Sequence, residues 1–182
     1  SERGDLSPLT FNQQEVRETA ELLEGRAFLQ NSATKEVLLN LEEEYPVVHF
    51  ATHAIADESN LQARLYLSSD STGENGILSM QELYGLQVES PLVVLSACQT
   101  AKGPVFGGEG VMSLARAFQY SGAKRVLASM WASDDESSYQ LMSTFFLNLR
   151  KGRNTGEALR VSREEWREES PSYLSHPYYW AN

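Results

Sequence analysis

The sequence predicts an α/β fold with a mainly parallel central sheet and helices on both of its faces. Apolar, β-rich runs alternate with helical patterns along the chain, which is typical of parallel strands joined by right-handed crossovers. The runs are almost continuously apolar, as in strands that are covered on both faces. The length of 182 residues suits one domain with a substantial core.

Five short runs are the expected strands, because their β-branched and aromatic residues favour extended backbone. They are residues 27–29, 47–51, 65–67, 92–95 and 126–128. The stretch 70–76 is polar and ends in glycine, which predicts a turn. Sites on a parallel sheet gather where the strands end, at the carboxyl edge.

Six segments have apolar residues at helical spacing. The first, 13–23, stops at Gly25, and the second is capped by Asn31 or Ser32 and continues through Glu44. The remaining four are 80–84, 110–120, 136–149 (after a cap at Ser133 or Asp134) and 155–168. We expect residues 1–182 to form a single domain, which is a fragment or the carboxyl-terminal domain of a longer protein.

The charge and composition exclude several classes of function. Fifteen basic and 25 acidic residues give a formal net charge of −10, which opposes binding to nucleic acid or anionic lipid. No apolar run approaches the roughly 20 residues that cross a bilayer, and the first residues lack a signal pattern, so we expect a cytoplasmic protein. One cysteine excludes an internal disulfide, and three scattered histidines give no zinc-type cluster.

A histidine and the only cysteine follow two of the expected strands. His53 comes just after 47–51, and Cys98 comes just after 92–95. If these strands are neighbours, both side chains enter one crevice, where the imidazole could stabilise a thiolate nucleophile. The loop after Cys98 contains Gly103, Gly107 and Gly108, whose backbone N–H groups could face an incoming peptide.

Each of these residues also has a purely structural interpretation. Free cysteines are usually inert and buried. The position of Cys98 alone therefore leaves both a packing role and a catalytic role open. A histidine after a strand, such as His53, is more often structural than catalytic. His49 lies inside its strand and is interpreted as a hydrogen-bonded, buried or half-buried histidine. His176 is a second candidate base, but its proline and tyrosine neighbours favour a packed terminal segment.

Seven strings in order resemble the CHAT family, which comprises caspase-like domains related to caspases and separases and often fused to tetratricopeptide repeats. The strings are His49-Phe50-Ala51-Thr52-His53, Leu95-Ser96-Ala97-Cys98-Gln99-Thr100, Gly108-Glu109-Gly110-Val111, Ala115-Arg116-Ala117-Phe118, Gly122-Ala123, Ser129-Met130-Trp131 with Asp134-Asp135, and His176-Pro177-Tyr178-Tyr179-Trp180. The resemblance runs from about residue 13 to the end of the sequence.

The resemblance implies a caspase-like three-layer sandwich and a catalytic dyad of His53 and Cys98. Caspases place the histidine about 50 residues before the cysteine, and here the interval is 45 residues. It further implies that the backbone N–H groups of Ala54 and Cys98 form the oxyanion hole. Relatives often have glycine where this chain has Ala54; alanine keeps the donor but narrows the range of φ.

The implied activity is that of a cysteine endopeptidase, which forms an acyl-enzyme on Cys98 and needs no metal or other cofactor. Asp134 and Asp135 are candidates for holding a basic residue before the scissile bond, as an acidic residue does in separases. Both also fit a helix N-terminus, and capping is the favoured role for at least one of them. Trp131 is interpreted as either a wall of the substrate groove or a core residue.

Two other functions use the same sequence features. A catalytically silent caspase-like domain would serve interaction or signalling, although such a scaffold has no chemical reason to keep both His53 and Cys98. A thiol-dependent acyl transferase or non-peptide hydrolase would use the dyad with another acceptor. The expected partners are a protein or peptide substrate and, by resemblance, attached tetratricopeptide repeats or a regulatory partner.

Overall fold

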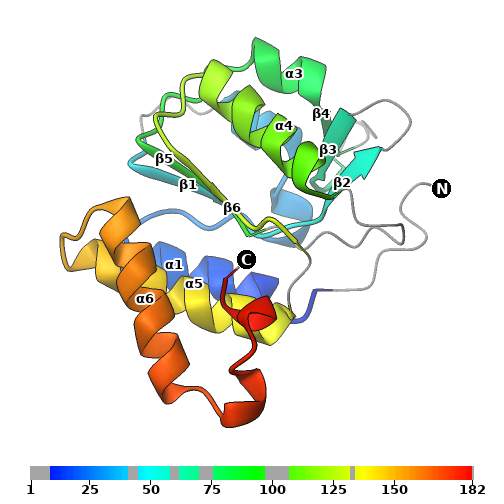
Figure 1. Ribbon diagram of the computed structural model, residues 1–182. Helices are drawn as coiled ribbons and strands as arrows, with labels where there is room; N and C mark the ends of the chain where they lie inside the picture. Colours follow the sequence, from blue (N-terminus) through cyan, green and yellow to red (C-terminus); the bar gives the residue numbers. More distant parts are fainter. Residues whose placement is uncertain are drawn as a thin grey trace. The chain divides into compact units, whose positions relative to one another are not determined.

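The structure, a computed structural model of the chain, describes residues 9–40, 45–57, 62–69, 76–96, 107–131 and 134–181. It contains two compact units. Unit 1 is built on Phe28–Ala132, and unit 2 on Leu9–Ala27 together with Ser133–Asn182. Among the described residues, all strands belong to unit 1, while unit 2 is helical (Figure 1).

The central sheet of unit 1 is parallel, which confirms the predicted α/β class and its caspase-like arrangement of a parallel sheet with packed helices. Its strand order is β1 (Val47–Phe50), β5 (Leu92–Leu95), β6 (Val126–Ala128). The two parallel pairings run without a break along the three strands. All four side chains of β5 are buried, as its continuous apolar run predicted.

A second sheet of unit 1 is antiparallel and follows β1 along the chain. It consists of β2 (Ala54–Asp57), β3 (Gln62–Tyr66) and β4 (Ile77–Ser79), in that order. The apolar run 65–67 predicted only the end of β3. The short strands β2 and β4 were not predicted, since three or four residues of mixed polarity carry little periodic signal.

Two helices pack on these sheets in unit 1. α3 (Met80–Gly85) contacts α4 (Gly107–Tyr120), and α4 in turn contacts β2, β3 and β6 (Figure 1). The prediction that Gly107 and Gly108 lie in a loop is wrong, because they form the first turn of α4. Gly103 lies outside the described residues.

The core of unit 1 lies between α4 and the two sheets. Phe118 of α4 is fully buried, and its ring lies 5.3 Å from that of Phe50 of β1. The other buried apolar side chains of this core include Leu65, Leu78, Leu83, Val93, Leu95, Leu114 and Ala117. Burial of this apolar surface is the main source of stability for the unit.

Local polar contacts set the ends of the helices in unit 1. Ser79 and Glu82 form a capping box at α3, in which Glu82 N–H donates to the Ser79 hydroxyl and Ser79 N–H to the Glu82 carboxylate. After α4, Gly122 has a φ of +111°, which disfavours any residue with a side chain.

Two predictions near the beginning of unit 1 are wrong. Residues 27–29 are not a strand, and the next helix, α2 (Lys35–Leu39), is short and begins later than predicted. Ser32 does not cap it, because Ser32 is in a 3₁₀ turn, η1 (Gln30–Ser32), where its hydroxyl bonds the backbone of Leu29. Thr34 supplies the cap instead, and the predicted end at Glu44 lies outside the described residues.

The described part of unit 2 contains three α-helices, each predicted from sequence to within one residue at either end. Helix α5 (Asp135–Arg150) contacts both α1 (Asn12–Leu22) and α6 (Thr155–Glu169). Two 3₁₀ turns follow, η2 (Ser172–Leu174) and η3 (Pro177–Tyr179). The largest buried apolar side chains of the unit are Leu141, Met142, Phe145, Phe146 and Trp166.

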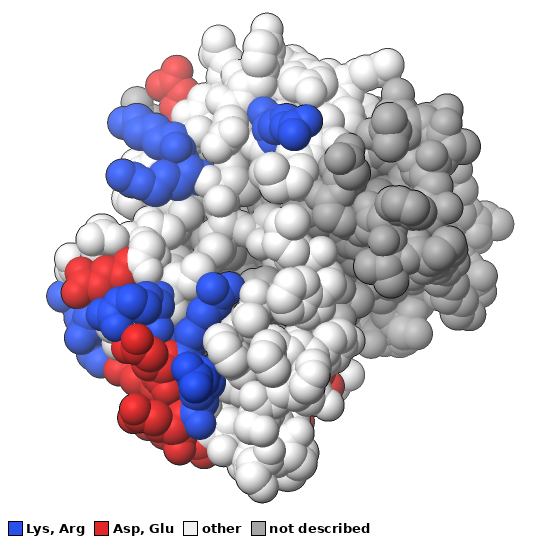
Figure 2. Space-filling view, viewed as in Figure 1, with Lys and Arg blue, Asp and Glu red and all other residues white. Residues whose placement is uncertain are grey.

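The outer surface of α6 carries charges of both signs, and Figure 2 shows the acidic and basic side chains interspersed there. Arg160 and Glu164 form an ion pair at 2.6 Å with both side chains more than half exposed. Such pairs contribute little to stability. In the part of the chain that is described, no helix has the length and apolar character needed to cross a membrane.

Candidate active site

The carboxyl ends of the three parallel strands meet at one edge of the central sheet. Phe50 of β1 is opposite Leu95 of β5, which is in turn opposite Ala128 of β6. The three strands therefore end at the same level (Figure 1). This is the edge at which ligands bind in open α/β sheets.

The chain leaving β1 reaches His53, whose backbone is held by the end of β3. Tyr66 N–H donates to the His53 carbonyl at 2.9 Å, and the Thr52 hydroxyl donates to the Tyr66 carbonyl. His53 itself is half-buried. Hydrogen bonds to the backbone of Tyr66 thus hold the backbone of this predicted base against the antiparallel sheet.

Ala54, the predicted oxyanion donor, is the first residue of β2 and is buried. His53 and Tyr66 occupy a hydrogen-bonded position of the antiparallel ladder, because of the bond just described. Hydrogen-bonded and non-hydrogen-bonded positions alternate, so Ala54 opposite Leu65 is of the second kind. Its N–H therefore points away from β3.

Cys98, the predicted nucleophile, lies outside the described residues. The chain leaving β5 is described as far as Ser96, whose N–H donates to the carbonyl of Phe50 at 3.1 Å. Ser96 is buried and is two residues before Cys98 in the sequence. The ladder between β1 and β5 thus continues past the last strand residues, up to the beginning of the segment that carries the cysteine.

His49 is hydrogen-bonded within the sheet, as predicted. Its Nε2 lies 2.8 Å from the Ser96 hydroxyl oxygen, and the imidazole is half-buried. The contact joins β1 to the chain leaving β5. Sequence reasoning did not single out Ser96, although its place two residues after Val94 puts its side chain on the same sheet face as Val94.

The three predicted substrate-binding residues belong to different units. Trp131 is half-buried and follows β6, the third strand that ends at the site edge. Asp134 and Asp135 are in unit 2, at the beginning of α5. The Ser129 N–H lies 3.5 Å from the Leu95 carbonyl, which holds the chain before Trp131 beside the end of β5.

Both carboxylates at the beginning of α5 accept backbone hydrogen bonds. Asp134 accepts from Ser137 N–H at 2.9 Å, which confirms its interpretation as the N-cap. Asp135 accepts from the N–H groups of Thr10 and Phe11 at 2.7 and 3.1 Å. The first contact stabilises α5 and the second joins the beginning of α5 to the beginning of α1.

His176, the second candidate base, is also in unit 2, where it caps η3 by accepting from Tyr178 N–H at 3.2 Å. Trp180 donates to the Ser175 carbonyl and lies under the Arg167 guanidinium, 4.8 Å from the ring centre. These contacts hold the terminal segment, as was expected for its aromatic residues.

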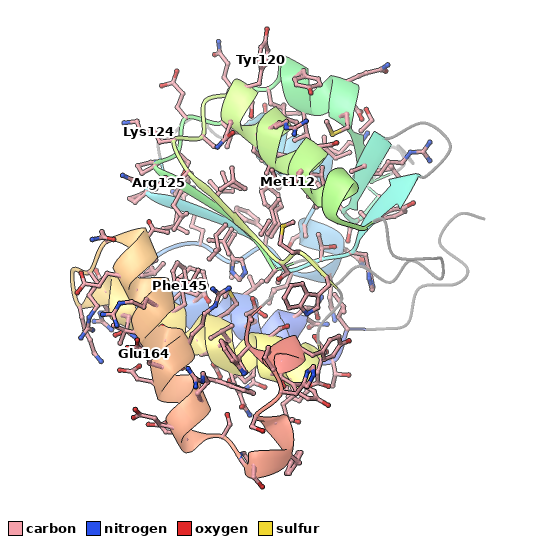
Figure 3. All side chains as sticks on the ribbon, viewed as in Figure 1. Met112, Tyr120, Lys124, Arg125, Phe145 and Glu164 are labelled. Carbon is pink, nitrogen blue, oxygen red and sulfur yellow. The ribbon has the colours of Figure 1, made fainter. Side chains whose placement is uncertain are left out.

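Two basic side chains of unit 1 lie away from the edge at which the parallel strands end. Lys124 and Arg125 are exposed and immediately precede β6, at the end of that strand away from Trp131 (Figure 3). Among the described residues, no three histidine, cysteine, aspartate or glutamate side chains are grouped so that they could hold a metal ion.

Comparison with known proteins identifies the family. The model of the CHAT domain matches residues 2–182. The chain belongs to the CHAT domain family. CHAT domains are caspase-like, which agrees with the parallel sheet and with the strand ends described above.

Two curated relatives resemble this CHAT domain. Tetratricopeptide repeat protein 28 of Mus musculus is 26% identical and that of Homo sapiens 25% identical, each over 211 aligned positions. Each alignment covers 96% of this chain but only 8% of the relative. This chain therefore corresponds to only a small part of each relative's length.

Proposed function

We propose that this CHAT domain is a cysteine endopeptidase with His53 and Cys98 as its catalytic dyad. The observation that carries the proposal is the parallel pairing of β1 with β5. It brings the chain leading to His53 alongside the chain leading to Cys98, and the only sulfhydryl of the sequence follows the second of them. A thiolate next to an imidazole is the activated nucleophile of thiol peptidases.

The reaction consists of acylation and hydrolysis. The Cys98 thiol gives its proton to His53, and the resulting thiolate sulfur attacks the scissile carbonyl carbon. The carbonyl oxygen takes the negative charge, stabilised by the N–H groups of Ala54 and Cys98. The C–N bond then breaks as the His53 imidazolium gives its proton to the leaving amine. Water attacks the thioester after giving a proton to His53, the S–C bond breaks, and the carboxylic acid leaves. No metal or cofactor takes part in these steps.

Site-directed variants test the dyad. Cys98→Ala and Cys98→Ser should reduce peptide turnover to the background rate. His53→Ala should lower kcat by about 10²-fold or more, the usual contribution of a general acid–base group. His176→Ala is the matched histidine control and should keep full activity, since that side chain caps a surface turn.

The same variants distinguish the competing functions. Iodoacetamide alkylation measures activation of the thiol independently of any substrate, and His53→Ala should lower its rate constant. A thiol whose reactivity does not depend on His53, in a chain without peptidase activity, would contradict the proposal and indicate an interaction domain. Trapping with Cys98→Ala identifies the bound substrate. Mass spectrometry of the product that the active protein makes from this substrate then separates hydrolysis from acyl transfer.

A preference for a basic residue before the scissile bond is the finer part of the proposal. Asp134 and Asp135 would contribute negative charge and Trp131 an aromatic wall. An ionised carboxylate has about four acceptor positions, so a capping aspartate can still pair with Arg or Lys. Asp134→Asn and Asp135→Asn should lower kcat/KM for Arg and Lys peptides while sparing apolar ones. Equal effects on both peptide classes would contradict a basic pocket.

The setting of the domain is proposed from its relatives. Since both relatives are named for tetratricopeptide repeats, we infer that the parent chain carries such repeats and that they regulate or deliver substrates to this CHAT domain. The acidic net charge favours a protein or peptide substrate over nucleic acid, and a cytoplasmic location remains our prediction.

A further inference from the structure

One polar side-chain contact lies between the two strand ends of the proposed dyad. His49 Nε2 and the Ser96 hydroxyl oxygen are 2.8 Å apart. In the parallel register His49 is opposite Val94, and Ser96 is two residues further along the β5 chain. The contact therefore crosses diagonally from β1 to the last described residue before Cys98.

Ser96 is held in place by its backbone as well as by its side chain. Its N–H donates to the Phe50 carbonyl, and the preceding Leu95 carbonyl faces the Ser129 N–H of the β6 chain. Only 8% of the Ser96 surface is exposed. In such a position water competes weakly, so a side-chain hydrogen bond constrains the local geometry more than it would at the surface.

The chemistry of the pair suits positioning rather than a reaction of its own. A serine hydroxyl at 2.8 Å from an imidazole also resembles a nucleophile with its base. Burial of Ser96, however, keeps its oxygen away from a peptide carbonyl. Either tautomer of the imidazole can make the hydrogen bond, because the hydroxyl donates to an Nε2 without hydrogen and accepts from an Nε2–H group.

We propose that His49 and Ser96 are a positioning pair for the catalytic dyad. Their hydrogen bond fixes the point at which the chain leaves β5 toward Cys98, relative to the chain that leaves β1 toward His53. This inference rests on the proposed peptidase function and extends it to two residues that do not touch the substrate. A small error in the placement of reacting groups costs rate rather than substrate affinity.

The test measures the alkylation rate constant of Cys98 and the kcat and KM of a cleaved peptide. Ser96→Ala should lower the rate constant and kcat by about threefold to tenfold, the range expected for the loss of one hydrogen bond, with KM unchanged. Ser96→Thr keeps the hydroxyl and should restore most of the rate. The measurements are made at a temperature at which circular dichroism shows every variant to be folded.

The matched control is Ser90→Ala, at the other end of β5. The Ser90 hydroxyl is also buried; it donates to the Tyr45 carbonyl at 2.8 Å and accepts from the Leu92 N–H at 3.3 Å, so its removal costs at least as much hydrogen bonding, far along the strand from the dyad. Ser90→Ala should lower stability but leave alkylation and kcat unchanged. Equal losses of rate in Ser90→Ala and Ser96→Ala would overturn the inference, because general destabilisation would then explain both.

A double-mutant cycle tests whether the two residues act as a pair. His49→Gln with Ser96→Ala should be no slower than the slower single variant, since either change removes the same contact. Additive losses, or an unchanged rate in Ser96→Ala while His53→Ala still slows alkylation, would overturn the positioning role alone. If His53→Ala has no effect on alkylation, the proposed peptidase function is refuted and the positioning role falls with it.

Discussion

The two units of this CHAT domain use polar side chains in different ways. In unit 1 the side chains of His49 and Ser96 connect adjacent strand ends, at the edge where the chain continues to the proposed dyad. In unit 2 the carboxylates of Asp134 and Asp135 accept backbone N–H groups at helix beginnings. The polar side chains of unit 1 thus join two strands next to the proposed dyad, whereas those of unit 2 fix where helices begin.

The largest expected effect comes from the apolar core that supports the strand ends. Phe118 is fully buried and packs against Phe50 of β1. Phe118→Ala should lower the free energy of unfolding by about 3–5 kcal/mol, measured by urea denaturation. Phe118→Leu retains more apolar volume and should cost clearly less. A loss below about 1 kcal/mol for Phe118→Ala would show that this contact does not hold the sheet and helix together.

In unit 2 the comparable central residue is polar. Asn148 is fully buried between α5 and α6, and its amide donates to the Thr144 carbonyl, the Ser162 hydroxyl and the Glu165 carboxylate. Its side-chain oxygen accepts from Arg153. The three acceptors share two amide hydrogens, so this network depends on a single side chain.

Asn148→Asp keeps the shape and the contact with Arg153 but removes the donors and places a second carboxylate near Glu165. We expect it to lower the free energy of unfolding by about 2–3 kcal/mol, the cost of leaving buried polar groups without their partners. Chemical denaturation measures the loss, and Gln140→Glu, on the exposed side of the same helix, is the control. Equal stability of Asn148→Asp and the unchanged chain would refute a stabilising role for the amide.

Much of the fold follows from sequence where one local signal dominates. The continuous apolar runs predicted β5 and β6 to the residue, and helical periodicity predicted α5 and α6 to within a residue at each end. The antiparallel sheet was missed, because β2 and β4 are defined by pairing with β3 and not by a pattern of their own. Ser32 failed as a helix cap because its hydroxyl bonds a closer backbone group.

The candidate site was predictable in part for the same reason. Strand ends and the order of the motifs were sufficient to propose His53 and Cys98, since both follow clear apolar runs. The hydrogen bond between His49 and Ser96 was not predictable, because it depends on the register of β1 and β5, which places His49 opposite Val94. The sequence also could not show that Asp135 accepts from Thr10 and Phe11, a contact between positions more than 120 residues apart.

A smaller effect sharpens the contrast at the beginning of α5. Asp134→Ala removes the N-cap and should lower the free energy of unfolding by about 1 kcal/mol. Asp134→Asn can still cap the helix and should lower the free energy of unfolding by only about a few tenths of a kcal/mol. The two variants therefore separate the effect of the hydrogen bond from that of the charge. Thermal unfolding with calorimetric enthalpy measures both. A larger loss for the Asn variant than for the Ala variant would contradict the capping role.

The smallest expected effect concerns an ion pair in each unit. In unit 1, buried Lys35 donates to Glu82 at 2.5 Å, whereas in unit 2 the Arg160–Glu164 pair is exposed on α6. Burial opposes ionisation of Glu82, but the hydrogen bonds from Lys35 and Ser79 outweigh it and lower the pKa of Glu82 below its usual 4.5. Glu82→Gln should therefore cost up to about 1 kcal/mol at neutral pH, and Glu164→Gln almost nothing.

The pH dependence of the Glu82 effect has a definite sign. A carboxylate with a lowered pKa stabilises the folded state above its unfolded value of about 4.5 and loses this contribution as the pH falls through the lower folded value. The difference in urea midpoint between the unchanged chain and Glu82→Gln should shrink on acidification. Because Glu82 is partly exposed, salt should also reduce it. A difference that grows in acid, or an equal cost for Glu164→Gln, would show that burial of Lys35 does not distinguish the two pairs.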